Sequence, residues 1–115
     1  MMASRNQSRI MYIERKAGNL TGAARIGRVS FSKTGKMLYY RDLSFHRIQG
    51  FKANYREADS GEEYWISGPH KDGNDALYKT NNRTEIDLDV QHEYWTAIRK
   101  KPEMVNEKSA LQPRG

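Results

Sequence analysis

The chain has 115 residues, a net charge of +6 and no cysteine. This length supports one domain with a single core and excludes large catalytic scaffolds. The absence of cysteine excludes disulfides, thiolate catalysis and cysteine-based zinc sites, and it is consistent with a reducing compartment. No apolar run reaches the roughly 18 residues of a membrane span, and the start of the chain is polar where a secretory signal has an apolar segment. We therefore expect a cytoplasmic protein without a membrane segment.

The charge changes sign along the chain. Residues 15–56 contain ten Lys or Arg against one acidic residue, a balance of +9. Residues 57–93 contain three Lys or Arg against ten acidic residues, a balance of −7. Either the folded protein has a basic side and an acidic side, or the two halves interleave and neutralise each other across strands.

The first half of the chain predicts a β-hairpin after an initial strand. Residues 1–8 lack periodicity and are expected to form a flexible arm, and residues 10–15 are rich in β-formers. In residues 26–32, Gly27, Val29 and Phe31 alternate with polar neighbours, and residues 37–41 have a similar composition. Gly35 lies between these two runs and can supply the positive φ of a hairpin turn.

Further short strands are predicted in the middle of the chain. Residues 43–48 and 51–57 indicate two short strands or one bent strand, broken at Gly50. Residues 63–67 follow the turn at 59–61, with Tyr64 and Ile66 on one side and Trp65 on the other. Residues 68–75 predict a loop before a short apolar return at 76–78.

Residues 89–101 predict the one helix. Val90, Tyr94, Ala97 and Ile98 have the spacing of a single buried stripe, which Trp95 widens. Asp87 or Asp89 can cap its start, and the basic residues 99–101 followed by Pro102 match its end. Residues 102–115 are expected to be a flexible tail.

These elements together predict an α+β, mainly β domain over residues 9–101. We expect a small antiparallel twisted sheet or an SH3-like barrel, with the C-terminal helix packed over an opening.

The basic segment, residues 15–56, is the main candidate for a binding surface. Aromatic residues interleave with its cations, as on β surfaces that stack bases and neutralise phosphates. The same alternation also arises when the aromatics form the core and the cations form a solvated face. The candidate polyanion-binding residues are Arg25, Arg28, Lys33, Lys36, Tyr39, Tyr40, Arg41, Arg47, Lys52 and Arg56.

Other candidate chemistry is weaker. His46, His70 and His92 lack the spacing of a metal site. The loop at residues 68–75, with His70, could hold a cation or a phosphate, although its polar residues are also those that form turns. Trp65 and Trp95 could line a small-molecule pocket, but core packing is the simpler interpretation. No cofactor motif is visible, so we expect no cofactor.

Four segments carry a resemblance to a known family: residues 11–18 (MYIERKAG), 24–29 (ARIGRV), 62–69 (EEYWISGP) and 93–95 (EYW). Over residues 11–101 the chain resembles a family of small uncharacterised bacterial proteins, sometimes labelled 1-deoxy-D-xylulose-5-phosphate synthase, a thiamine-diphosphate enzyme. The Gly-Asp-Gly motif of such enzymes would fall at Lys71-Asp72-Gly73, where the first glycine is missing. The asparagines that should follow come too early, so magnesium and diphosphate have no recognisable cradle. The resemblance implies a bacterial origin and no function.

We therefore expect a non-enzymatic binding module whose partner is nucleic acid or another polyanion, such as an acidic protein surface, engaged through residues 15–56. The alternative is a protein-interaction adaptor that uses the acidic residues 57–93 or the loop at residues 68–75. An enzyme is the third possibility, and the oligomeric state is left open.

Overall fold

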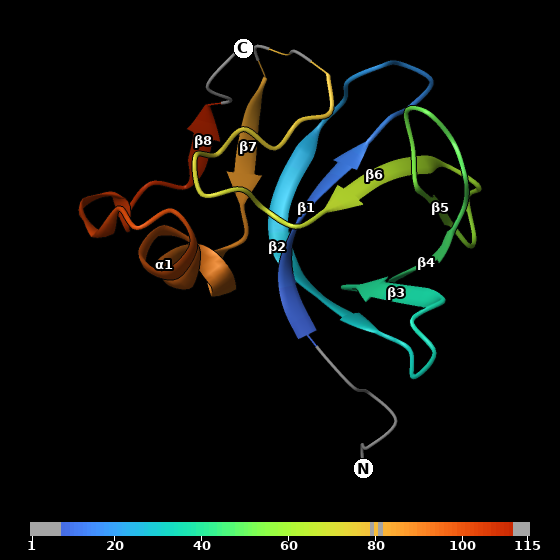
Figure 1. The fold of residues 1–115 in the computed structure, drawn as a ribbon, viewed down its shortest axis with the longest axis horizontal. Helices are drawn as coiled ribbons and strands as arrows, with labels where there is room; N and C mark the ends of the chain where they lie inside the picture. The colour runs from blue at the N-terminus through green and yellow to red at the C-terminus, as the bar shows by residue number, and fades with distance from the viewer. Residues whose placement is uncertain (1–7, 79, 81, 112–115) are drawn as a thin grey trace.

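The fold is a closed barrel with a small extension on one side (Figure 1). A computed structural model of the chain describes residues 8–78, 80 and 82–111. Six strands form the barrel: β1 (Ser8–Arg15), β2 (Ala24–Phe31), β3 (Met37–Tyr40), β4 (Leu43–Arg47), β5 (Tyr55–Glu57) and β6 (Glu63–Ser67). Neighbouring strands are antiparallel, and β1 closes the barrel by pairing with both β2 and β6. The prediction of a mainly β domain with an SH3-like barrel and one C-terminal helix is confirmed.

The β2–β3 hairpin forms where the sequence predicted it. Ser30 pairs with Tyr39, and Phe31 pairs with Leu38. Gly35 in the connecting turn has a φ of 78°, in the left-handed region that glycine occupies without a steric penalty. The middle of the chain forms two short strands, β4 and β5, rather than one bent strand.

The barrel interior holds the first of two hydrophobic clusters. Inward-facing residues of β1 to β6 fill it, with Leu38 and Phe45 fully buried. Tyr64 packs its ring edge-on against Phe45, with 4.7 Å between the ring centroids. Tyr64 and Ile66 thus belong to the interior, as the alternation in β6 predicted.

A second cluster lies on the outer face of β1 and β2, which differs from the expected single core. Tyr12 and Ile26 pack there against Val90, Tyr94 and Trp95 of the C-terminal helix. Both faces of these strands are therefore buried, because Met11 and Ile13 point into the barrel while Ile10 and Tyr12 point out of it. Trp65 also packs against the second cluster, so both tryptophans contribute to the core.

The helix is shorter and less regular than predicted. It runs through η1 (Leu88–Val90), α1 (Gln91–Glu93) and η2 (Tyr94–Ile98), of which η2 is a π-helical turn. It ends at Ile98 instead of residue 101. Ala97, which lies in the π turn, is exposed and Gln91 is buried, against the predicted stripe. Asp87 occupies the N-cap position of η1, one of the two positions predicted, but its side chain makes no cap hydrogen bond there.

The expected C-terminal tail contains ordered structure. It forms η3 (Pro102–Met104) and then β8 (Ser109–Leu111), an antiparallel partner of β7 (Arg83–Ile86). β7 in turn pairs in parallel with β2. Trp95 Nε1 donates a hydrogen bond of 2.9 Å to the Glu107 carbonyl, which ties this segment to the helix. Residues 112–115, and residues 1–7 of the expected N-terminal arm, lie outside the described residues; Ser8 already belongs to β1.

Candidate binding surface

The two halves of the chain neutralise each other across the fold. Six cations from residues 15–56 form ion pairs with carboxylates from residues 57–93. The pairs are Arg15–Glu62, Arg25–Asp87, Arg28–Glu93, Arg41–Asp87, Lys52–Glu63 and Arg56–Glu63. A further cation of the segment, Lys16, is fully buried against Glu14. The interleaved arrangement, one of the two that the charge pattern allowed, therefore holds for most of the segment.

The Asp87 carboxylate accepts hydrogen bonds from three of the predicted binding residues. Its Oδ1 accepts hydrogen bonds of 2.8 Å from both Arg25 Nε and Arg41 Nη2, and its Oδ2 accepts one from the Tyr40 hydroxyl. Burial, followed by this hydrogen bond, raises the pKa of Tyr40 to about 12. Tyr40 is a buried barrel residue and Asp87 is almost completely buried, so Tyr40 does not belong to the surface that the sequence predicted.

Gly27 makes room for this arrangement. A Cβ atom at residue 27 would lie 2.5 Å from Asp87 Oδ2 and 2.5 Å from Tyr40 Cε1. Real Cβ atoms do not approach other atoms so closely, and neither the buried ring nor the buried carboxylate has space to move.

Arg41 adopts an unusual backbone conformation next to this carboxylate. Tyr40 pairs with Leu43, so Arg41 and Asp42 form a two-residue turn between β3 and β4. The φ of Arg41 is 55°, where a non-glycine residue carries a steric cost of about 1–2 kcal/mol. The ion pair with Asp87 holds the side chain of Arg41, while the backbone of Arg41 reverses the direction of the chain.

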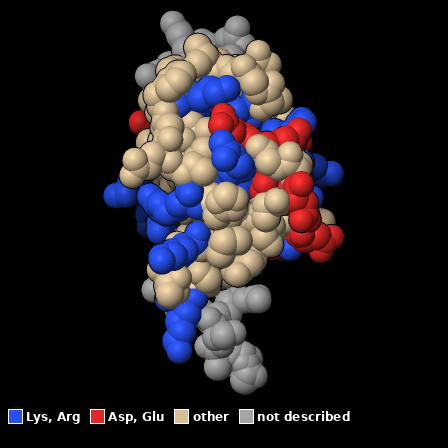
Figure 2. Space-filling model, turned by 90° about the vertical axis from the view of Figure 1, so that its right-hand side faces the viewer, with Lys and Arg blue, Asp and Glu red and all other residues tan. Residues whose placement is uncertain are grey.

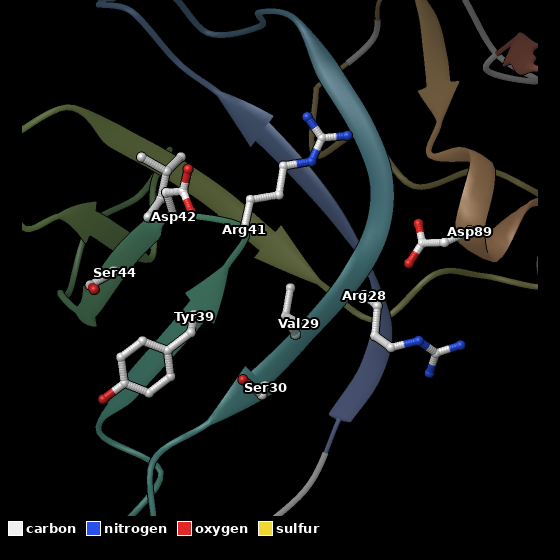
Figure 3. Close-up of a pocket in the computed structure, with 9 residues that line it drawn as sticks. Arg28, Val29, Ser30, Tyr39, Arg41, Asp42, Ser44 and Asp89 are labelled. Atoms are coloured by element: carbon white, nitrogen blue, oxygen red, sulfur yellow. The ribbon is translucent and has the colours of Figure 1, made fainter. Parts of the chain in front are cut away.

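An open depression lies in front of this turn (Figure 3). It has a volume of about 530 Å³, within the range of about 300–1,000 Å³ typical of ligand sites. β2 and β3 pair only at residues 30–31 and 38–39, and β2 pairs with β7 only at residues 24–26. The depression occupies the gap between these two pairings. Its lining residues are Arg28, Val29, Ser30, Tyr39, Arg41, Asp42, Leu43, Ser44 and Asp89.

Tyr39 lies on the outward side of the barrel wall in this depression. Its neighbours in the strands, Leu38 and Tyr40, are buried inside the barrel, and Tyr39 itself is partly exposed. Ser30 pairs with it on one side and Ser44 on the other. An aromatic ring therefore sits between two hydroxyl groups on the same outward face.

Arg28 connects this depression to a second one. The second depression, of about 300 Å³, is lined by Arg28, Glu93 and Ile98 together with Arg9. We call the two depressions together the β2 groove; its residues are those of the first depression plus Ser8, Arg9, Ile10, Pro69, Glu93 and Ile98.

The remaining predicted residues lie away from the β2 groove. Lys33 and Lys36 lie in the loop that connects β2 and β3. Arg47 contacts Tyr55, with its guanidinium 5.6 Å from the ring centroid. Lys52 and Arg56 share Glu63 on the β5–β6 side. On the face shown in Figure 2, most acidic atoms gather on one side and Lys and Arg atoms lie mainly opposite, with some among the acids.

The sequence reasoning missed several groove residues. Arg9 was placed at the start of the folded domain but not among the binding residues, and Ser30 and Ser44 were treated as ordinary strand residues. The outward position of Ser30 follows from its alternation with Val29 and Phe31, so that signal was present. The approach of Asp89 and Glu93 to β2 depends on the parallel β2–β7 pairing, which no local pattern indicated.

The acidic half is largely engaged in internal contacts. The Glu57 carboxylate accepts hydrogen bonds from the backbone N–H groups of Asp59 and Ser60, and these contacts lower its pKa. The Arg15 guanidinium lowers the pKa of Glu62. In the loop at residues 68–75, the backbone N–H of His70 donates to the buried Asp75 carboxylate, so this carboxylate helps to shape the loop.

The described residues contain neither a metal-binding cluster nor a membrane-spanning helix. No three His, Asp or Glu side chains lie close enough together to hold a metal ion. No helix in this part of the chain is both long and apolar enough to cross a membrane.

Comparison with known proteins gives no relative: no protein-family model, curated protein or solved structure matches the chain. The resemblance to a bacterial family therefore stays a prediction.

Proposed function

We propose that the protein is a small non-enzymatic module that binds single-stranded nucleic acid along the β2 groove. The observation that carries this proposal is that an outward aromatic ring, Tyr39, lines one open depression together with Arg28 and Arg41. Aromatic rings that stack bases, combined with cations that contact phosphates, are the usual means of binding single strands. Ser30 and Ser44 add hydroxyl groups that can contact phosphate or sugar oxygens.

The ion pairs within the groove still allow binding of phosphate. Arg28 and Glu93 are bonded at 2.5 Å, but their side chains are 36% and 53% exposed. Exposed pairs of this kind contribute about 0–1 kcal/mol, so a phosphate group can replace the carboxylate at little cost. Arg25 and Arg41 share the single carboxylate of Asp87, which leaves one positive charge uncompensated.

The local charge supports a modest electrostatic contribution. Residues 24–47 contain six Lys or Arg and one acidic residue, a balance of +5. Adding the three carboxylates of Asp87, Asp89 and Glu93, which reach this surface from the second half, reduces the balance to +2. We therefore expect contacts with about two phosphates, for which affinity for a single strand falls roughly sevenfold between 50 and 200 mM salt.

Fluorescence anisotropy with labelled dT12 and rU12 tests the proposal. The wild-type protein should bind both at low salt, and Tyr39→Ala should weaken binding by about tenfold, because stacking contributes about 1–3 kcal/mol per base. Tyr39→Phe, which keeps the ring, should bind almost as the wild type does. Arg28→Gln should also weaken binding, whereas Arg83→Gln, outside the groove and bonded to Ser109, serves as the matched control. No binding at protein concentrations of about 100 μM in 25 mM salt would reject the proposal.

The adaptor that uses residues 57–93 has less support. Glu57, Glu62 and Glu63 are engaged in contacts within the fold, so their carboxylates are less available to a partner. Binding of a basic peptide that Glu62→Gln abolishes and Tyr39→Ala leaves unchanged would favour the adaptor instead.

A further inference from the structure

Two carboxylates in the β2 groove have no role in the binding described so far. Asp42 and Asp89 are exposed and line the same depression as Arg28 and Tyr39. Neither has a hydrogen-bond or ion-pair partner among the described residues, whereas Glu93 and Asp87 both do. A surface that served only to neutralise phosphates would gain nothing from these two carboxylates, because they repel the negatively charged backbone of the nucleic acid. Each has two oxygen atoms that can accept hydrogen bonds from a ligand.

The backbone of Asp89 is anchored more firmly than that of Asp42. Asp89 lies in η1, where the Asp87 N–H donates 2.9 Å to the Ile26 carbonyl and Val90 is fully buried, although the Asp89 carboxylate itself is exposed. Figure 3 shows its side chain directed from η1 toward β2. Asp42 lies instead in the two-residue turn after Arg41, away from this packing. A group that discriminates between ligands has to be carried by a rigid part of the fold, and the anchored backbone of Asp89 meets this requirement better than the turn that holds Asp42.

The chemistry of a fixed carboxylate selects among the bases of a single strand. Unpaired bases expose their Watson–Crick edges to a protein. On that edge guanine alone presents two adjacent donors, N1–H and the N2 amino group, which match the two oxygens of a carboxylate. Adenine and cytosine each present one amino group beside an acceptor nitrogen, and that nitrogen would face a carboxylate oxygen. Hydrogen bonds to an ionised acceptor are also stronger than neutral ones.

We infer that the β2 groove prefers guanine-containing single strands and that Asp89 accepts the two hydrogen bonds from the guanine edge. Tyr39 stacks a base while Arg28 and Arg41 contact phosphates, so affinity and base selection come from different residues. This inference rests on the proposed function, and it names the class of strand that the same groove takes.

The test compares three labelled oligonucleotides by anisotropy at fixed salt. They are dT12, the alternating (dG-dT)6 and the matching (dI-dT)6, in which hypoxanthine keeps N1–H but lacks the N2 amino group. The wild-type protein should bind (dG-dT)6 about tenfold more tightly than dT12, the range expected for a bidentate base contact, with (dI-dT)6 between them. The readout is the ratio of the Kd values, which a general change in charge or folding does not alter.

Two charge-matched variants assign the contact. Asp89→Asn should bring the ratio of the dT12 and (dG-dT)6 Kd values close to one while dT12 still binds. Asp42→Asn removes the same charge from the same depression and should keep the ratio. Equal binding of dT12 and (dG-dT)6 by the wild type would overturn the inference while leaving the proposed function standing. Loss of the ratio in Asp42→Asn but not in Asp89→Asn would overturn the assignment to Asp89. If no oligonucleotide binds, both the inference and the proposed function fail.

Discussion

Lys16 Nζ lies 3.1 Å from Glu14 Oε2, and both side chains are buried, Glu14 in β1 and Lys16 directly after that strand. The Leu20 carbonyl also accepts a hydrogen bond from Nζ, at 2.6 Å. Glu14 accepts two more, from the Tyr12 hydroxyl and from the backbone N–H of Gly22. The donors and acceptors of the pair are thus satisfied inside the fold, and Lys16 is unavailable to any polyanion.

Removing one member of this pair should be costly. Lys16→Met leaves the Glu14 carboxylate buried without its counter-charge, and we expect the free energy of unfolding to fall by about 3–5 kcal/mol. The double variant Glu14→Gln/Lys16→Met should recover part of this loss, because the neutral amide oxygen can still accept the hydrogen bond from Gly22 while the amide NH2 donates to the Tyr12 hydroxyl oxygen. Urea denaturation measures the free energy of unfolding of both variants. A loss below about 1 kcal/mol for the single variant would mean that water reaches the site.

Gly27→Ala tests the packing around Asp87. The new methyl group would collide with Asp87 and Tyr40, and overpacking of this kind costs about 1–3 kcal/mol. Gly68→Ala is the matched control, because a Cβ there meets only the far end of the Arg9 side chain, at 3.4 Å. Thermal unfolding of the two variants should therefore differ clearly, and equal melting temperatures would contradict the packing described for Gly27.

Trp95 should be the most sensitive position of the C-terminal helix. Its side chain is 1% exposed and bonded to the Glu107 carbonyl, so Trp95→Ala should cost about 3–5 kcal/mol through the cavity it leaves. Ile98→Ala should cost less, because Ile98 is only partly buried. Melting of Trp95→Ala at the wild-type temperature would show that the helix is peripheral to the fold.

Tyr40 should make stability sensitive to alkaline pH. Its pKa is raised to about 12 in the folded protein, first by burial and then by its bond to Asp87, against an ordinary value of 10.0. Because the pKa is raised on folding, the stability that the Tyr40 hydroxyl contributes is complete below pH 10 and is lost as the pH rises toward 12. Urea denaturation at pH 8 and pH 11 should show the advantage of the wild type over Tyr40→Phe shrinking at the higher pH. A constant advantage would place the hydroxyl in contact with solvent.

Local patterns were sufficient to predict the barrel, but the long-range pairings were not. The alternation of Val29 with polar neighbours and the glycine at residue 35 fixed the β2–β3 hairpin, because both signals act within a few residues. β7 and β8 are short and depend on partners distant in the sequence, such as the pairing of Thr84 with Ala24 and Ala110. Propensity alone does not indicate such strands.

The candidate site was predicted only in part for the same reason. Arg28, Arg41 and Tyr39 do lie together, as expected from the composition of residues 15–56. The pairing of Arg25 and Arg41 with Asp87 required knowledge that the chain returns beside β2, 46 residues after Arg41. Tyr40 was assigned to the surface because the sequence does not tell which of two neighbouring tyrosines points into the barrel.

The most direct measurement is a two-dimensional ¹H–¹⁵N NMR titration of the protein with dT12. The proposed function predicts that backbone signals of residues 28–30 and 39–44 shift together with increasing oligonucleotide, while those of β5 and β6 stay in place. Shifts centred on the acidic residues 57–63, or signals that do not move at all, would contradict a binding surface at the β2 groove.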